Sequence, residues 1–369
     1  MRKKYIISGI GIGDSGTSKF LEKLLAYNCN YIVVTPGRHL KLKTLLKRKA
    51  FGKFFIGLLY YIANLTSFRI RCFFIRYSEI ILIHPQSIGL RTSMRLVKRN
   101  KLIKYFVLDS FLFCKQSYNY NYLVGGECIK CISEKPDPHC KSFPLQCSDK
   151  LHKRFRLSVT GSSNVEFFFQ NENHRKLHQQ VINKKPSSVI GLETSDEFFG
   201  DLVPLGARQN YIIYHGDLMN AKGRELLAML VAGLPDIRFV VPGNDHLFGL
   251  SPNVEMHDVR WQTGLKELVQ NATVVLCLST WSAPIETALT KSIRSNGVVV
   301  VADLEYAFCS EFCDRALLRI SMLNPIKSCR DVRRLYDSRE LQTEAIEQSN
   351  SQLSILNYQS INTLLKMAI

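Results

Sequence analysis

Four predominantly apolar runs dominate the second half of the chain and alternate with longer, mixed segments. The runs cover residues 211–214, 237–241, 273–278 and 297–302. Strands that are apolar at nearly every position are typical of a parallel sheet whose two faces are both covered by helices. The segments between the runs are long enough for crossover helices. We therefore expect a doubly wound α/β unit whose ligand crevice lies at the carboxyl ends of the strands.

The first half of the chain carries a similar pattern. The apolar spacing from Phe20 to Leu25 predicts a helix between two strands, and a chain of 369 residues can bury two cores. The stretch 201–210 contains Pro204 and Gly206 and lacks periodicity, so we place the domain boundary there. The prediction is two domains, 1–205 and 206–345, and a terminal helix, 346–369. The expected strands of the first domain are 5–8, 31–34, 79–83, 105–108, 165–169 and 188–192.

Polar residues and glycines follow two of the strands in the second half. His215-Gly216 comes directly after the first strand, and Lys222 lies a few residues further on. Segment 279–286 follows the 273–278 strand, and Pro284 is predicted at the first position of the next helix. The amino terminus of a helix offers free N–H groups and the positive end of its dipole. A diphosphate could rest there while Lys222 supplies a positive charge.

The order and spacing of these segments resemble one known family over about a hundred residues. The resemblance is to the retaining glycosyltransferases of the GT-B fold, family 4. It implies two Rossmann-like domains facing a central cleft, with a nucleotide-sugar donor (a UDP- or GDP-sugar) held by the second domain and no required metal or other cofactor. In such enzymes a terminal helix often packs back on the first domain. The segments that carry the resemblance are Tyr214-His-Gly to Lys222-Gly, 234–243, 265–275 and Trp281-Ser-Ala-Pro284.

The match to the family's donor residues is partial. In the family, a basic pair neutralises the donor diphosphate, and two glutamates eight positions apart contact the sugar and the ribose. Lys222 keeps the lysine of the pair, whereas Asp217 stands in place of the arginine. Ala283 and Lys291 occupy the glutamate positions, and Glu286 is the nearby carboxylate. Either Glu286 has taken over the acid's role, which we favour, or the chain is a catalytically impaired scaffold. In the alternative without a functional role, the negative charge of Glu286 only stabilises the helix through its favourable interaction with the positive end of the helix dipole.

The resemblance also suggests an acceptor-side candidate and a donor set. Asp109 follows the expected 105–108 strand, and in the family a histidine often precedes this aspartate, whereas Leu108 precedes it here. The catalytic candidates are therefore Lys222, Glu286 and Asp109. The candidate donor-binding residues are Gly11, Gly13, Gly216, Lys222, Thr280, Ser282, Pro284 and Glu286.

The first turn contains the sequence Gly11-x-Gly13-x-x-Gly16, which invites a different interpretation. This spacing occurs in NAD(P)-dependent oxidoreductases, but the acid expected about twenty residues later is missing. Thr17 also stands where a phosphate-binding P-loop has its lysine. The same glycines fit a GT-B enzyme whose first loop approaches the donor phosphates or the acceptor. They could equally serve only a tight turn from strand to helix.

The formal net charge of +18 comes entirely from the first 104 residues, which hold 21 Lys and Arg against three acids. The other 265 residues hold 28 of each sign. The basic segment 38–53 leads directly into the apolar segment 54–65, which is too short to span a bilayer. Cations followed by apolar and aromatic residues are typical of an interfacial helix on anionic lipids. The expected membrane-facing residues are Lys47, Arg48, Lys49, Lys53, Phe54 and Phe55.

Four of the eleven cysteines lie within twenty residues, at Cys128, Cys131, Cys140 and Cys147. Four thiolates could close a structural zinc site, although only the first pair has the spacing of a zinc knuckle. Some family 4 enzymes carry a similar insert near 114–147. A basic face with a zinc site could also bind nucleic acid, but no recognised reader module accompanies it, so we expect no nucleic-acid partner.

The amino terminus starts with basic residues but breaks at Gly9, so we expect a first strand and not a signal peptide. The remaining cysteines are expected to be reduced thiols of a cytoplasmic protein. The sequence thus predicts a cytoplasmic glycosyltransferase on the inner face of the cytoplasmic membrane. It would transfer a sugar to a lipid-linked saccharide acceptor during assembly of a bacterial surface polysaccharide of the O-antigen or capsule type.

Overall fold

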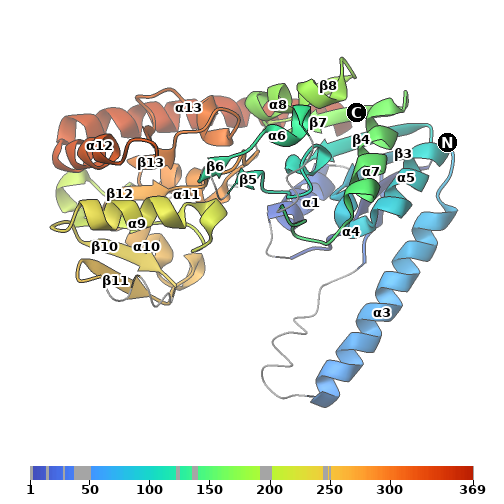
Figure 1. Cartoon of the computed structure of the whole chain (residues 1–369), viewed down its shortest axis with the longest axis horizontal. Helices are drawn as coiled ribbons and strands as arrows, with labels where there is room; N and C mark the ends of the chain where they lie inside the picture. The colour runs from blue at the N-terminus through green and yellow to red at the C-terminus, as the bar shows by residue number, and fades with distance from the viewer. Residues whose placement is uncertain are drawn as a thin grey trace.

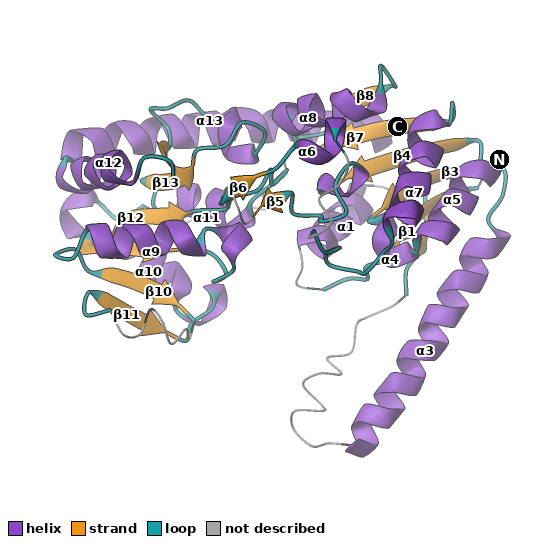
Figure 2. Cartoon of the chain, viewed as in Figure 1, coloured by secondary structure: helices purple, strands orange, loops and turns teal. Residues whose placement is uncertain are grey.

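The computed structural model contains two lobes, each built on a six-stranded parallel sheet (Figures 1 and 2). We call them the first lobe and the second lobe, in chain order. The structure describes residues 3–13, 16–27, 30–36, 51–121, 125–134, 140–191, 202–243, 248 and 251–368, and the side chains of these except Tyr27 and 357–368.

The sheet of the first lobe has the order β2-β1-β3-β4-β7-β8, and all of its pairings are parallel. A two-stranded antiparallel ribbon, β5 (Tyr120–Asn121) with β6 (Gly126–Glu127), belongs to the insert that follows β4. The sheet strands are β1 (Lys4–Ser8), β2 (Ile32–Val34), β3 (Glu79–Ile83), β4 (Leu102–Val107), β7 (Val165–Phe169) and β8 (Ser187–Val189).

Helices connect the strands of the first lobe, as parallel pairing requires. The longest of them, α3, projects from the lobe in Figure 1. The helices are α1 (Gly16–Tyr27), α3 (Phe51–Phe74), α4 (Pro85–Ile88), α5 (Leu90–Arg99), α6 (Lys130–Ser133), α7 (Asp149–Gly161) and α8 (Glu172–Ile182), with a 3-10 turn η1 (Ser110–Leu112).

The second lobe has the strand order β11-β10-β9-β12-β13-β14, again parallel throughout. Its strands are β9 (Gln209–Tyr214), β10 (Phe239–Pro242), β11 (Val254–His257), β12 (Ala272–Cys277), β13 (Val299–Ala302) and β14 (Leu318–Ile320). Its helices are α9 (Arg224–Gly233), α10 (Leu265–Asn271), α11 (Thr287–Ser295) and α12 (Pro325–Asp337), and its 3-10 turns are η3 (Leu205–Ala207), η4 (Asn220–Lys222), η6 (Trp261–Thr263) and η7 (Phe308–Glu311).

The terminal helix α13 (Arg339–Ala368) links the lobes. It packs on α11 and α12 of the second lobe and also contacts α1 of the first lobe. Its course along both lobes is visible at the top of Figure 1.

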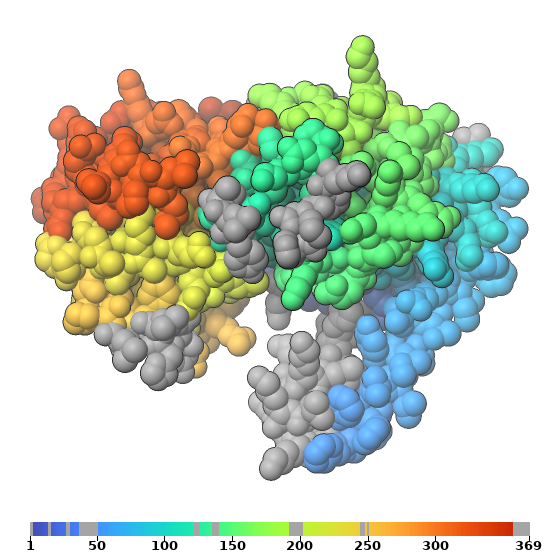
Figure 3. Space-filling model, viewed as in Figure 1, coloured from blue at the N-terminus to red at the C-terminus, as the bar shows by residue number. Residues whose placement is uncertain are grey.

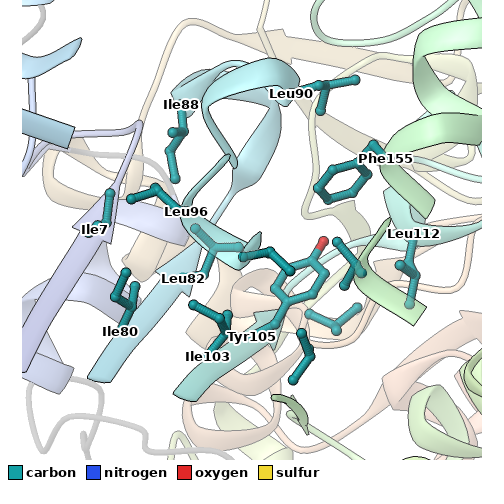
Figure 4. Close-up of a cluster of buried hydrophobic side chains, with 14 of the residues drawn as sticks. Ile7, Ile80, Leu82, Ile88, Leu90, Leu96, Ile103, Tyr105, Leu112 and Phe155 are labelled. Atoms are coloured by element: carbon teal, nitrogen blue, oxygen red, sulfur yellow. The ribbon is translucent and has the colours of Figure 1, made fainter. Parts of the chain in front are cut away.

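Each sheet is buried on both faces, as the continuous apolar runs predict. In the first lobe, Ile80 and Leu82 of β3 face one helical layer while Ile81 and Ile83 face the other. Figure 4 shows the first of these layers, in which Tyr105 and Phe155 pack beside the β3 side chains. The doubly wound fold class expected from the sequence is therefore confirmed, with both sheets parallel.

The strands at 79–83 and 165–169 lie where the sequence places them. Besides the short ribbon of β5 and β6, the sequence missed β11 and β14, which lie at the two edges of the second sheet. Apart from Ile320, which is buried, and Glu255, which is exposed, the residues of β11 and β14 are partly buried, so neither strand has the long apolar run that marks a central strand. The pattern of hydrophobic residues thus identifies the centre of each sheet better than its margins.

Helix α3 is twice as long as the apolar segment that predicts it. Gly57, Phe68 and Cys72 are buried against the lobe, while much of the remaining surface is exposed and apolar. Figure 3 shows the helix (blue) standing away from the second lobe. Within the described part of the chain, no helix is both long and apolar enough to cross a membrane. Lys53, Phe54 and Phe55 lie in its first turns, whereas Lys47, Arg48 and Lys49 lie outside the described residues.

Candidate active site

The structure brings Lys222 and Glu286 together at the carboxyl ends of β9 and β12. The ammonium of Lys222 donates hydrogen bonds to Ser279 Oγ at 3.1 Å and to Glu286 Oε1 at 3.3 Å. The Ser279 hydroxyl also donates to the Glu286 carboxylate. The side chains of Lys222 and Glu286 are 19% and 10% exposed. The two residues singled out from the sequence therefore form one largely buried ion pair.

The loop that holds Lys222 is fixed through its backbone, which accepts hydrogen bonds from Tyr214 and packs closely at Gly223. The Tyr214 hydroxyl lies 2.7 Å from the carbonyl of Asp217 and 2.8 Å from that of Lys222, and it donates to this pair of acceptors. Gly223 follows with φ +87°, which favours glycine. A Cβ atom there would lie 2.0 Å from the carbonyl oxygen of Leu278. The Lys222 turn is therefore pressed against the end of β12, which carries Ser279.

The helix after β12 starts later than the sequence predicts. Helix α11 begins at Thr287, so Pro284 does not stand at its first position, and that prediction is wrong. Glu286 is instead the N-cap residue of α11, although its side chain makes no capping hydrogen bond. A carboxylate at this point lies at the positive end of the helix dipole. Ser282 and Pro284, in the segment before α11, both accept hydrogen bonds from the first lobe.

The insert after β4 reaches across to this segment. Asn119 of the first lobe donates to Ser282 Oγ at 2.7 Å and accepts from the Ser282 N–H at 3.1 Å. Glu127 accepts from the Ser282 hydroxyl and from the backbone N–H groups of Glu305, at 3.1 Å, and Tyr306, at 3.3 Å. Burial raises the pKa of the Glu127 carboxyl. In Figure 3 the insert (teal) lies at the junction of the lobes.

Aromatic side chains from both lobes cover the Lys222 ammonium. Tyr118 of the insert stacks on Trp281, with ring centroids 4.2 Å apart and an interplanar angle of 26°. The ammonium lies 5.5 Å from the Trp281 ring centroid and 5.8 Å from that of Tyr118. Among the described residues, no hydrogen-bond partner reaches the buried indole Nε1 of Trp281. A buried donor of this kind next to a lysine can serve a polar ligand.

Two further polar links join the lobes beside the insert. Asn171, the N-cap of α8, donates to the carbonyl oxygen of Pro284 at 2.6 Å. The backbone N–H of Asn173 donates to Glu311 Oε1 at 2.7 Å. Together with Asn119 and Glu127, these contacts attach three segments of the second lobe to the first.

Ala283 and Lys291, which the sequence resemblance aligns with two glutamates, are part of the packing. Ala283 is buried in a cluster with Tyr120 and Trp281. The Lys291 ammonium lies 4.6 Å from the ring centroid of Trp261, on which His215 stacks at 5.2 Å. Burial, with a smaller effect of Lys291, lowers the pKa of His215 to about 3. These two positions hold no acid, so Glu286 is the carboxylate that stands next to Lys222.

The other expected donor residues lie around the same turn. Thr280 donates through its hydroxyl to the Asn220 carbonyl at 3.1 Å, which joins the β12 end to the Lys222 turn. At Gly216, an added Cβ would lie 2.8 Å from the Tyr214 hydroxyl oxygen. Thr280 and Gly216 thus shape the loops that carry Lys222 and Glu286.

The first-lobe glycines lie in the turn after β1. Gly11 is buried and its carbonyl accepts from the Ser18 hydroxyl at 2.8 Å, whereas Gly13 is exposed. The tightest backbone approach in this turn is at Gly9, where a Cβ would lie 2.2 Å from the backbone of Ser87 and Ile88. The packing therefore requires a glycine at Gly9, which is not part of the Gly11-x-Gly13-x-x-Gly16 motif.

Asp109 faces a histidine that the sequence did not single out. His84 follows β3 in a left-handed conformation, with φ 52° and ψ 66°, and its Nε2 lies 3.9 Å from Asp109 Oδ2. The Nδ1 atom of His84 lies 2.8 Å from the Ser87 hydroxyl. Burial raises the pKa of the Asp109 carboxyl and lowers that of the His84 imidazole. Strained non-glycine backbone of this kind clusters at functional sites.

The four expected zinc ligands do not form one cluster. Cys131 is hydrogen-bonded to Cys114, and this contact is the largest of the effects that lower the pKa of Cys131 to about 7. Cys128 accepts from Asn121 and Cys147 donates to Ser142. In the described ranges, no group of three or more His, Cys, Asp or Glu side chains could hold a metal ion. The structure therefore gathers none of the four expected zinc ligands into such a group. These ligands were Cys128, Cys131, Cys140 and Cys147.

The comparison with known proteins identifies the fold. No protein-family model matches the sequence, and no curated protein matches it. Sucrose-phosphate synthase from Thermosynechococcus elongatus is 12% identical, with a TM-score of 0.64 over 100% of this chain and 97% of that one. HepE from Anabaena, in complex with UDP-glucose, is 13% identical, with a TM-score of 0.61 over 99% and 100%. WaaG, a glycosyltransferase involved in lipopolysaccharide biosynthesis, is 12% identical, with a TM-score of 0.60 over 99% and 98%. At these identities the likeness establishes that the chain has the two-lobed GT-B fold.

Proposed function

We propose that the chain is a glycosyltransferase that takes a sugar from a UDP- or GDP-sugar donor bound by the second lobe. The observation that carries this proposal is the largely buried pair of Lys222 and Glu286 at the strand ends, beside the indole N–H of Trp281, for which the described residues provide no hydrogen-bond partner. An ammonium has three donors, and Ser279 and Glu286 take two of those of Lys222. The third can reach a diphosphate oxygen. A structural neighbour, HepE, is described in complex with UDP-glucose.

The chemistry follows from where the charges stand. Lys222 would stabilise the negative charge that develops on the departing diphosphate. Glu286 would hold the ammonium in place and contact a ribose hydroxyl. Asp109, with His84, would orient the acceptor hydroxyl from the first lobe. Retention of anomeric configuration and independence of a metal are carried over from the sequence resemblance, and activity that persists in EDTA would support the latter.

The acceptor in this proposal is a lipid-linked saccharide, and the enzyme works on the inner face of the cytoplasmic membrane in surface polysaccharide assembly. Two features support it. Exposed apolar residues, among them Phe55 and Leu59, extend along α3, and the net positive charge lies in the first 104 residues. A helix with these properties can lie in an anionic membrane surface.

A donor screen tests the proposal. Thermal unfolding is measured with a panel of UDP- and GDP-sugars, and the expected result is a rise in Tm with at least one of them, since ligand at 100 times its Kd stabilises by about 2.7 kcal/mol. Lys222→Ala should abolish this rise and lower transfer at least about 100-fold, the scale of one lost charge-stabilising donor. Lys266→Ala, on α10, is the matched control and should behave as wild type.

Two outcomes would contradict the proposal. If no nucleotide sugar shifts the Tm, the chain is a scaffold that has lost donor binding. If NADH binds tightly and nucleotide sugars do not, the oxidoreductase interpretation of the Gly11-x-Gly13-x-x-Gly16 turn is the better one.

A further inference from the structure

A pocket of about 550 Å³ lies in the first lobe, where the second half of α3 meets α4, α5 and residues 145–151. Arg69 of α3 and Arg91 of α5 line it, together with the apolar side chains of Leu90 and Phe111. Among the described residues that line this pocket, none is acidic. A pocket of this size is large enough for the head of a small organic ligand. Its lining combines two positive charges with apolar walls.

The positive charge continues along α5. Arg91, Arg95 and Arg99 are four residues apart, so their side chains follow one face of that helix. The guanidinium groups of Arg95 and Arg99 stack over the ring of Phe73 on α3, at 4.8 and 5.4 Å from its centroid. Over the residues that the structure describes, neither Arg69 nor Arg91 forms an ion pair with a carboxylate. Their charge is therefore available to an anion.

An apolar stripe on α3 leads away from the same pocket. Phe55, Leu59, Ile62 and Phe73 lie at helical spacing on one side of α3, and each is at least 38% exposed. Arg69 falls within 40° or so of that side at about 100° per residue. One helix thus presents an extended apolar surface and, next to it, a cation that lines the pocket. This arrangement suits an amphiphile with an anionic head.

The pocket is also lined by residues close in sequence to the acceptor-side candidates. Gln86 and Phe111 line it, and each lies two residues after a member of the His84 and Asp109 pair. Gln86 is held in place because it accepts from the Ser117 hydroxyl at 3.1 Å and donates to the Phe143 carbonyl at 3.3 Å. A head group in the pocket would therefore stand close to the loops expected to orient the acceptor.

We infer that this pocket binds the phosphate or diphosphate head of a lipid, with Arg69 and Arg91 on the phosphate oxygens and the hydrocarbon chain along the α3 stripe. The inference rests on the proposed function, since the ligand would be the lipid carrier of the acceptor saccharide. Guanidinium groups bind phosphate through paired N–H donors, and apolar surface removed from water holds the chain. The pocket thus gives the acceptor side a binding site separate from the Lys222 turn.

Binding of a short amphiphile to the full chain tests this. Farnesyl diphosphate is titrated against wild type by calorimetry, with inorganic pyrophosphate and farnesol as separate arms. We expect farnesyl diphosphate to bind at least tenfold more tightly than either arm, and both Arg69→Ala and Arg91→Ala to weaken it at least tenfold. Arg71→Ala is the matched control: it lies on the opposite side of α3, donates to the Thr35 carbonyl and should leave the affinity unchanged.

Each contrary outcome has a distinct meaning. Pyrophosphate that binds as tightly as farnesyl diphosphate would show a free-anion site, and farnesol that binds equally would show a purely apolar one; either overturns the inference. Unchanged binding in both arginine variants also overturns it. Arg69 and Arg91 are exposed, so both variants should fold, and their Tm shifts with the nucleotide sugar found by the donor screen should match wild type. A failed donor screen with intact farnesyl diphosphate binding would instead contradict the proposed function alone.

Discussion

The two lobes share a parallel six-stranded sheet covered by helices, yet they present different surfaces. In the second lobe the charges balance around a buried ion pair, Lys222 with Glu286. In the first lobe a long helix leaves large apolar side chains exposed, and the chain's excess positive charge lies in the same region. One sheet architecture therefore carries two different surfaces: a largely buried polar turn in the second lobe, and an exposed apolar surface beside basic residues in the first.

The first test of this contrast between the lobes changes the backbone of the second lobe. Gly223→Ala should lower the free energy of unfolding by about 3 kcal/mol or more, because it adds a Cβ at φ +87° within 2.0 Å of the Leu278 carbonyl oxygen. Urea unfolding followed by circular dichroism measures this. Gly206→Ala is the matched control, since a Cβ there would meet nothing within 4 Å. Equal stability of the two variants would show that the Lys222 turn is not held as the structure places it.

A second test uses acid, because both lobes bury neutral histidines. Burial lowers the pKa of His215 to about 3, from an ordinary value of 6.5, and that of His178 to about 4. The folded state therefore binds fewer protons than the unfolded state below pH 6.5, so stability falls as the pH drops. Between pH 7.5 and 5, His215 alone should account for about 2 kcal/mol. Urea unfolding at both pH values should show a smaller loss for His215→Gln than for wild type, and an equal loss would contradict the buried neutral imidazole.

A third test addresses the contact between the lobes. Asn119→Ala should leave the N–H of Ser282 without its partner and weaken the link by about 1 to 3 kcal/mol. Amide hydrogen exchange resolved by mass spectrometry should show faster exchange in the peptide that contains Ser282. Asn271→Ala removes an exposed hydrogen bond within α10 and should leave that peptide unchanged. Unaltered exchange in Asn119→Ala would mean that other contacts hold the lobes together.

The sequence predicts the sheets well because central parallel strands are apolar on both faces. It also brings Lys222 and Glu286 to one place, since the carboxyl ends of neighbouring strands meet at one sheet edge. It could not predict Asn119 and Glu127, because they reach the site from an insert and Asn119 lies 163 residues from Ser282. The resemblance of the insert near 114–147 to that of some family 4 enzymes was the one signal that pointed near them.

Two further differences have physical reasons. Glycine spacing drew attention to Gly11 and Gly13, whereas the structure demands glycine at Gly9 and Gly223, where another backbone approaches closely. Such an approach depends on tertiary packing, which no local spacing encodes. His84 was missed for the same reason, since its partner Asp109 comes from the next strand of the sheet.

The smallest expected effect concerns the membrane surface and a single charge on α3. Lys53→Ala should weaken sedimentation with anionic liposomes about fivefold, since one cation near such a surface contributes about 1 kcal/mol. The loss should shrink as salt is raised, because screening shortens the reach of the charge. Lys176→Ala, an exposed lysine on α8, is the control and should sediment as wild type. The triple variant of Lys47, Arg48 and Lys49 should lose more, in proportion to charge. If Lys53→Ala and Lys176→Ala sediment alike at low salt, the first lobe does not meet lipid through α3, and its contrast with the second lobe reduces to net charge.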